Sequence, residues 1–150
     1  MTPLELQTYL HAHIPLSSAM QVSVIEALPE QVVLAAPLAP NINHRDTVFG
    51  GSASAVAILA AWCLLHTRLS ALSIDSRLVI QRNTMGYEHP IAGDFTARAC
   101  EPAPEAWALF KRMLERKGRA RIAVSSTLWY EGRAAGQFEG EFVAIAAGQI

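Results

Sequence analysis

Apolar residues recur along this chain with two different spacings, which predict three helices and six strands. Leu6, Tyr9 and Leu10 have near-helical spacing, with Thr2 placed as the N-cap and Pro15 ending the segment. Short β-branched or alternating runs separated by turn residues are typical of strands. The predicted helices cover residues 3–13, 51–69 and 104–115, and the predicted strands cover 20–28, 31–36, 74–84, 94–100, 119–129 and 134–145.

The segment from residue 53 to residue 65 has no charged side chain, which predicts a helix buried on most sides. It is shorter than the roughly 20 residues needed to cross a bilayer, so we expect it inside a domain rather than in a membrane. An antiparallel sheet curled around this helix explains its nearly all-round hydrophobicity. We therefore predict one α+β domain over residues 1–150, and its open sheet edges favour pairing of two copies.

A polar loop with a glycine pair, residues 43–52, leads directly into this helix, and we call it the glycine loop. The first N–H groups of a helix have no intrahelical acceptor, and the helix dipole favours negative charge beside them. Gly50 and Gly51 leave room for a ligand to approach the backbone. No Asp or Glu occurs between Thr47 and Asp75. These features predict a site for an anionic atom.

Composition narrows the class of protein. A formal net charge of -1 over 150 residues argues against a general nucleic-acid binder. Two distant cysteines in apolar surroundings predict neither a disulfide framework nor a metal site, and a reducing cytoplasm is the expected compartment. The N-terminus does not resemble a signal peptide. We expect no metal and no organic cofactor.

The glycine loop resembles that of hotdog-fold thioesterases of the phenylacetyl-CoA type, whose pattern is Asn-x-x-Gly-Thr-x-His-Gly-Gly. Here the pattern begins at Asn43 and ends at Gly51. Two positions differ, because Asp46 replaces the family's glycine and Phe49 replaces its histidine.

A closer resemblance, over essentially the whole chain, is to the YiiD C-terminal-domain family of thioesterase-like proteins. The motifs that carry it are Pro40-Asn41-Ile42-Asn43, Thr47-x-Phe49-Gly50-Gly51-Ser52, Ala61-Trp62 and Tyr87-x-x-Pro90-Ile91-x-x-Asp94. Stand-alone members of this family include malonyl-acyl-carrier-protein decarboxylases. The resemblance implies a hotdog-fold homodimer with its active site at the dimer interface, and it leaves open whether two dimers pair into a tetramer. It also implies a substrate carried on phosphopantetheine or coenzyme A.

The chemistry follows from what the helix lacks. Phenylacetyl-CoA-type enzymes place an Asp or Glu about two turns after the glycines, where this chain has Ile58. Loss of a positioned base forfeits roughly 10²- to 10⁴-fold in hydrolysis. Decarboxylation of a malonyl thioester needs no base, only stabilisation of an enolate oxygen. The expected donors are the Asn43 amide and the N–H groups of Gly50, Gly51 and Ser52, with His44 or water returning the proton.

Other residues are candidates for binding substrate, each with a structural alternative. Asn43 could instead bind its own backbone, the glycines could serve only helix packing, and Ser52 could be the N-cap. His44 could be a solvated loop residue, and Asp46 could orient His44 or form a turn. Tyr87 could line the acyl pocket or shape a corner. The candidate substrate-binding residues of the loop and corner are Asn41, Asp46, Thr47, Phe49, Gly50 and Tyr87.

Half of the twelve basic residues lie within eleven positions, and we call them the basic patch. Its members are Lys111, Arg112, Arg116, Lys117, Arg119 and Arg121. Such a cluster is either a solvated helix end or a docking site for an acidic carrier protein or coenzyme A phosphates. Arg116 and Arg119 are the candidate docking residues.

Three functions stay open. The first is decarboxylation of malonyl carrier protein or malonyl-CoA to the acetyl thioester, which primes fatty-acid synthesis. The second is an acyl-CoA or acyl-carrier thioesterase in which Asp46 or His44 activates water. The third is a non-catalytic module that binds acyl thioesters.

Overall fold

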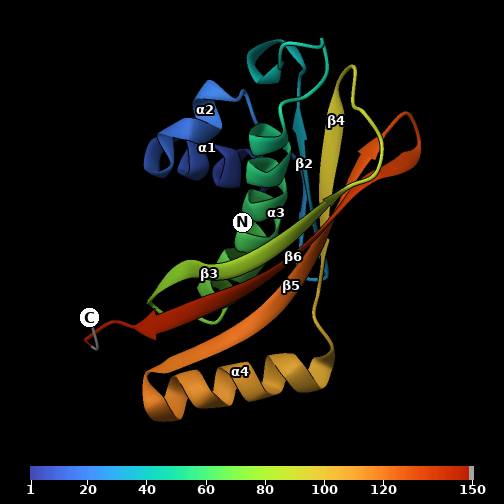
Figure 1. Cartoon of the computed structure of the whole chain (residues 1–150). Helices are drawn as coiled ribbons and strands as arrows, with labels where there is room; N and C mark the ends of the chain where they lie inside the picture. Colours follow the sequence, from blue (N-terminus) through green and yellow to red (C-terminus); the bar gives the residue numbers. More distant parts are fainter. Residues whose placement is uncertain (149–150) are drawn as a thin grey trace.

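The computed structural model describes residues 1–148 and confirms the predicted α+β fold, with a six-stranded antiparallel sheet curved around one long helix (Figure 1). The strand order across the sheet is β1-β2-β4-β5-β6-β3. The helices are α1 (Pro3–His13), α2 (Pro15–Ala19), α3 (Gly50–Ala71) and α4 (Pro104–Lys117), with a 3₁₀ turn at Ala39–Asn41. The strands are β1 (Ser23–Leu28), β2 (Gln31–Ala36), β3 (Ser76–Tyr87), β4 (Phe95–Cys100), β5 (Arg119–Tyr130) and β6 (Arg133–Ala146).

The first helix begins as expected and is followed by a helix that was not predicted. The Thr2 hydroxyl accepts from the Glu5 N–H, and the Glu5 carboxylate accepts from the Thr2 N–H, so both ends of a capping box are present. α1 ends at His13, and Pro15 opens the five-residue helix α2. A proline that ends one helix is well suited to the first turn of the next, because that position needs no N–H donor.

α3 is the core of the molecule. It runs for 22 residues, a little longer than predicted, and ten of them are buried. By length and composition it could span a membrane, but more than half of its most apolar window is buried within this fold, as in a core helix. The Ser126 hydroxyl on β5 donates to the Ala57 carbonyl (2.9 Å), which fixes the helix against the sheet.

The strands alternate as a sheet with one covered face requires. In β4, Phe95, Ala97 and Ala99 are buried toward the core, and the residues between them are more exposed. The β5–β6 hairpin turns at Glu131 and Gly132, both with positive φ, which is the geometry of a type I′ turn. This hairpin joins the two strands that were predicted over residues 119–129 and 134–145.

β3 lies at one edge of the sheet, and among the strands of residues 1–148 it pairs with β6 alone. It extends to Tyr87, so Gly86 and Tyr87 belong to this strand rather than to the predicted corner. A bulge interrupts its register between Ile80 and Arg82. The other edge is β1, which contacts α1. β3 is therefore a twelve-residue strand with one free row of backbone groups.

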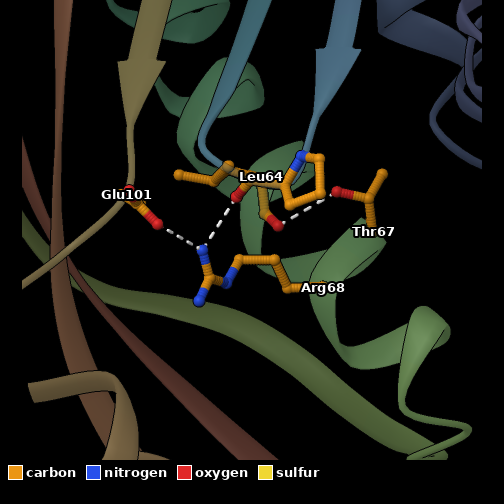
Figure 2. A network of polar contacts seen from close by, with 5 residues as sticks. Leu64, Thr67, Arg68 and Glu101 are labelled. Atoms are coloured by element: carbon orange, nitrogen blue, oxygen red, sulfur yellow. Dashed lines mark hydrogen bonds and ion pairs between the residues drawn. The ribbon is translucent and has the colours of Figure 1, made fainter. Parts of the chain in front are cut away.

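The C-terminal end of α3 is tied to three other segments by Arg68 (Figure 2). The Arg68 guanidinium donates to Glu101 (2.9 Å) and to the Pro29 carbonyl (2.8 Å), and it lies 4.3 Å above the ring of Trp107 on α4. Thr67 donates to the Leu64 carbonyl one turn earlier (3.1 Å). Through these contacts Arg68, whose side chain is only 16% exposed, joins the β1–β2 turn, the end of β4 and α4 at one point.

Candidate functional site

Asn43 holds the glycine loop together. Its side-chain oxygen accepts from the N–H groups of Arg45 (2.8 Å) and Thr47 (3.1 Å), and its amide donates to the Thr47 hydroxyl (2.9 Å). Asp46 has a left-handed backbone with φ of 62°, which closes the turn. An Asn amide carries two N–H donors, so one of them is left without an acceptor among the described residues. Asn43 thus has a structural role in the loop and also one amide N–H that could donate to a ligand.

Asn41 lies beneath the loop rather than on it. Its side chain is buried, and its amide donates to the carbonyls of Met20 (3.0 Å) and Pro37 (2.8 Å). The backbone carbonyl of Asn41 accepts from the Phe49 N–H (2.7 Å). Both amide donors are used within the fold, so Asn41 positions the entry to α3 from below.

α3 begins at Gly50, one residue earlier than predicted. Phe49 is the N-cap residue and its side chain makes no capping hydrogen bond, so the expectation that Ser52 could be the cap is wrong. The first backbone bond of the helix runs from Ala53 to Phe49 (3.0 Å). Within residues 1–148 the N–H groups of Gly50, Gly51 and Ser52 have no acceptor. These three open donors lie where the sequence predicts a site for an anionic atom.

Phe49 explains why one of the glycines is needed. A Cβ atom at Gly51 would lie 2.4 Å from the Phe49 ring, so the ring covers that position. The Phe49 side chain is 57% exposed. Phe49, Gly51 and Ser52 line a cavity of about 330 Å³ together with α2 and Met20. An aromatic ring therefore borders the open N–H groups at the position where related loops have histidine.

A second cavity, of about 340 Å³, lies on the other side of the helix start, and we call it the Tyr87 cavity. Its lining includes Thr47, Gly50 and Tyr87, which the sequence singles out. The Tyr87 hydroxyl donates to the Gly50 carbonyl (3.1 Å), and a Cβ at Gly50 would be in ordinary contact with that ring. The structure thus brings together three of the predicted binding residues.

Two titratable residues of this cavity were missed by the sequence reasoning. Glu88 and His89 line it, because their N–H groups both bind the Ala135 carbonyl on β6 (2.9 and 3.1 Å). Their place in the chain, directly after Tyr87, was the available signal. They supply a carboxylate, which α3 lacks, and an imidazole close to the start of that helix.

His44 and Asp46 lie in the exposed part of the glycine loop, and neither they nor the half-buried Asn43 line the two cavities. Between Gly50 and Ala71 the helix has no acidic residue, and Ile58 packs against the core. In the part of the chain that the structure describes, no cluster of three His, Cys, Asp or Glu side chains could hold a metal ion. The start of the helix therefore offers N–H donors and no carboxylate, and its one histidine, His66, lies more than four turns farther along.

The basic patch lies at the other end of the sheet. Arg119 pairs with Ile145, which in turn pairs with Arg77 near the start of β3, whereas Tyr87 at the end of β3 pairs with Gly136. Arg116 and Arg119 are both exposed. Within one copy, the structure does not bring these arginines to the glycine loop.

A cluster of stacked rings lies where α1 meets α3. His66 stacks on both Tyr9 (4.6 Å between centroids) and Trp62 (4.7 Å), whose own centroids are 6.4 Å apart, and Tyr9 also stacks on His13 (4.0 Å). Burial, and secondarily the nearby His13, lowers the pKa of His66. Burial raises the pKa of the Cys63 thiol well above its usual range, so Cys63 is an inert core residue.

Comparison with known proteins gives a consistent family. Residues 4–146 match the model of the YiiD_C family, whose description reads "Putative thioesterase (yiiD_Cterm)". A protein from Chlorobaculum tepidum TLS is 28% identical, with a TM-score of 0.90 and 97% of each chain covered. A "putative thioesterase" from Shewanella oneidensis is 24% identical, with a TM-score of 0.84 and 95% of this chain and 96% of that chain covered. A "probable thioesterase" from Pseudomonas aeruginosa is 20% identical, with a TM-score of 0.81 and 96% of each chain covered. The predicted hotdog fold is confirmed.

Proposed function

This chain belongs to the YiiD_C family of thioesterase-like proteins, and we propose that within it the chain decarboxylates a malonyl thioester to the acetyl thioester. The observation that carries the proposal is the start of α3. Gly50, Gly51 and Ser52 present N–H groups without acceptors, on a helix that has no carboxylate from Gly50 to Ala71. That combination suits a reaction in which negative charge develops on a thioester oxygen.

The step breaks the bond between the malonyl carboxylate carbon and the α-carbon. Its electron pair moves into the thioester as an enolate, CO₂ departs, and a proton is then added to the α-carbon. Each well-aimed donor to the enolate oxygen is worth about 3 to 4 kcal/mol of barrier in comparable oxyanion sites. The N–H groups of the helix start and the free amide N–H of Asn43 are the proposed donors. A helix carboxylate would oppose the developing charge.

The proton can come from water or from an imidazole. His44 is the candidate from the loop, where it is exposed. His89 is the better placed group, because it lines the Tyr87 cavity together with Thr47 and Gly50. We therefore propose His89 beside His44 as the donor of the final proton.

Thioester hydrolysis is the second candidate, and Glu88 favours it. This carboxylate lines the Tyr87 cavity, where it could activate a water molecule as the general base that α3 does not supply. Asp46 and His44 on the loop are weaker candidates for this task, since they line neither cavity. The thioesterase descriptions of the family and its relatives agree with this alternative.

We propose a homodimer formed through the free edge of β3. Two copies related by a twofold axis would pair this strand antiparallel, so that the Ser76 end of one copy lies beside the Tyr87 end of the other. Arg119 lies at the Ser76 end of its own sheet. The basic patch of one copy would then flank the glycine loop of its partner, where an acyl carrier protein or coenzyme A must dock.

One assay separates these functions. Purified protein is incubated with malonyl carrier protein while intact thioester mass and free thiol are followed together. Loss of CO₂ with the thioester retained supports decarboxylation, and free thiol supports hydrolysis by Glu88. If neither malonyl nor acyl carrier substrates change in mass or release thiol, the non-catalytic binding module is the function that remains.

The docking role of the basic patch has its own test. Arg116→Glu combined with Arg119→Glu should raise the KM for malonyl carrier protein and leave the KM for malonyl-pantetheine unchanged. The small substrate is the control, because it keeps the reacting group and lacks the acidic carrier. An unchanged KM for the carrier substrate would contradict docking at these residues.

A further inference from the structure

A groove of about 450 Å³ lies between α4 and the outer face of the sheet, and we call it the α4 groove. In Figure 1, α4 runs beneath β5 and β6, at the end of the sheet far from the glycine loop. The residues that line the groove are Gln81, Leu109, Phe110, Met113, Arg119, Ala120, Arg121 and Val143. Its volume falls in the range of roughly 300 to 1,000 Å³ that is typical of small-molecule sites.

One part of the lining is apolar. Phe110 and Val143 are buried, whereas Leu109 is 50% exposed and Met113 is 37% exposed. Both exposed side chains come from α4 and flank the groove rather than the core. The groove therefore offers an unfilled apolar wall to any chain that lies along it.

The other part carries charge. Arg119 and Arg121 lie on the outer face of β5, and Arg121 is 3.9 Å from the Glu141 carboxylate. Gln81, at the bulge of β3, donates to the same carboxylate. Two guanidinium groups and one carboxylate leave one net positive charge beside the apolar wall. Arg119 has no ion-pair partner within residues 1–148.

We propose that the α4 groove binds a medium-chain fatty acid, with the alkyl chain against Leu109 and Met113 and the carboxylate between Arg119 and Arg121. A carboxylate accepts two parallel N–H bonds from a guanidinium, and its single charge matches the net charge of the groove. Within one copy this site shares no lining residue with the two cavities at the glycine loop, although Arg119 and Arg121 also belong to the basic patch.

Trp107 provides a reporter within the same helix. Its ring is 5.5 Å from that of Phe110, which lines the groove, whereas Trp62 stacks on α3 and Trp129 lies on β5 beside Arg98. A decanoate brominated along its chain should quench Trp107 fluorescence saturably when titrated into the full chain. Trp107→Phe should remove that quenching while unlabelled decanoate still binds by calorimetry.

Chemistry of the head group and length of the chain are tested separately. Decanol should bind at least roughly tenfold more weakly than decanoate, because a hydrogen bond to a charged group is lost. Between hexanoate and decanoate, affinity should rise about fourfold for each methylene that the groove can bury. Decanoyl-CoA and decyl phosphate form the comparison arms, and the proposal requires the free carboxylate to bind more tightly than either.

Variants locate the site. Arg121→Gln should lower decanoate affinity roughly tenfold and leave decanol unaffected. Glu141→Gln should tighten decanoate binding by up to about fivefold, since a like charge is removed beside the head group. Arg133→Gln is the matched control, because Arg133 lies at the β5–β6 hairpin and does not line the groove. Equal binding of decanoate and decanol, an unaltered Arg121→Gln affinity, quenching that survives Trp107→Phe, or no saturable binding would each overturn the proposal.

Discussion

The two roles of Asn43 can be separated by two substitutions at one position. Its side chain makes three hydrogen bonds inside the glycine loop, two accepted from N–H groups and one donated to Thr47. At about 1 kcal/mol each, and less where water can replace them, these bonds contribute about 2 kcal/mol to stability. Asn43→Ala removes all three.

Asn43→Asp keeps the loop and removes the donor. A carboxylate can still accept from the N–H groups of Arg45 and Thr47, and the Thr47 hydroxyl can donate to its second oxygen. We expect the free energy of unfolding to fall by less than about 1 kcal/mol. The kcat for malonyl-thioester decarboxylation should nevertheless fall by about 10²- to 10³-fold, since no N–H remains at this position to stabilise the enolate.

Urea unfolding and single-turnover decarboxylation, followed by mass spectrometry, measure the two effects on the same preparations. Arg45→Ala is the matched control from the same loop, because it leaves the Arg45 backbone N–H in place, and both quantities should match the parent. Parental kcat in Asn43→Asp would refute the donor role. Equal loss of stability in the Asp and Ala variants would refute the role of the carbonyl oxygen in the loop.

Three further predictions concern stability, each measured by urea unfolding. Because the fold lowers the pKa of His66, the unfolded chain binds a proton at this side chain more readily than the folded chain does. The free energy of unfolding should therefore fall as the pH falls from about 7.5 through 6.5 toward the lowered pKa. His66→Phe should flatten that part of the pH profile, and an unaltered profile would contradict the assignment to His66. Arg68→Met should lower the free energy of unfolding by about 1 to 2 kcal/mol, because it removes the hydrogen bonds to Glu101 and Pro29 and keeps a side chain of similar length. An unchanged free energy would show that water replaces these bonds at no cost. Gly132→Ala should cost about 1 kcal/mol through the positive φ of 78° alone, since nothing lies within 4 Å of the added Cβ, whereas Gly132→Asn should restore most of it.

Local pattern was enough to predict the strands and the longer helices, because each has its own periodicity and its own end signals, whereas the short helix α2 was missed. Thr2 capped a helix, the uncharged segment formed the core helix, and the positive-φ turn at Gly132 joined β5 to β6. The pairing of β3 with β6 has no such signal, since the two strands are separated by β4, α4 and β5. Their adjacency depends on how the whole sheet wraps around α3.

Only the part of the candidate site that is formed by residues adjacent in the sequence could be predicted. The open N–H groups follow from Gly50 and Gly51 at a helix start. In contrast, Glu88 and His89 enter the Tyr87 cavity because their backbone binds Ala135, which is more than forty residues away along the chain. Ser52 was misjudged as a possible cap because Phe49 begins the helix without any capping side chain.

The position of β3 has a consequence for how the protein is made. Its only neighbour in the sheet is β6, which emerges from the ribosome after α4 and β5. Until then, β3 has left the exit tunnel without a partner, and its backbone must stay hydrated or be shielded by chaperones. Before β6 is added, both edges of β3 are unpaired, so a nascent chain offers two edges where the finished sheet offers one. Arrival of β6 covers one of them and leaves only the edge proposed for dimerisation.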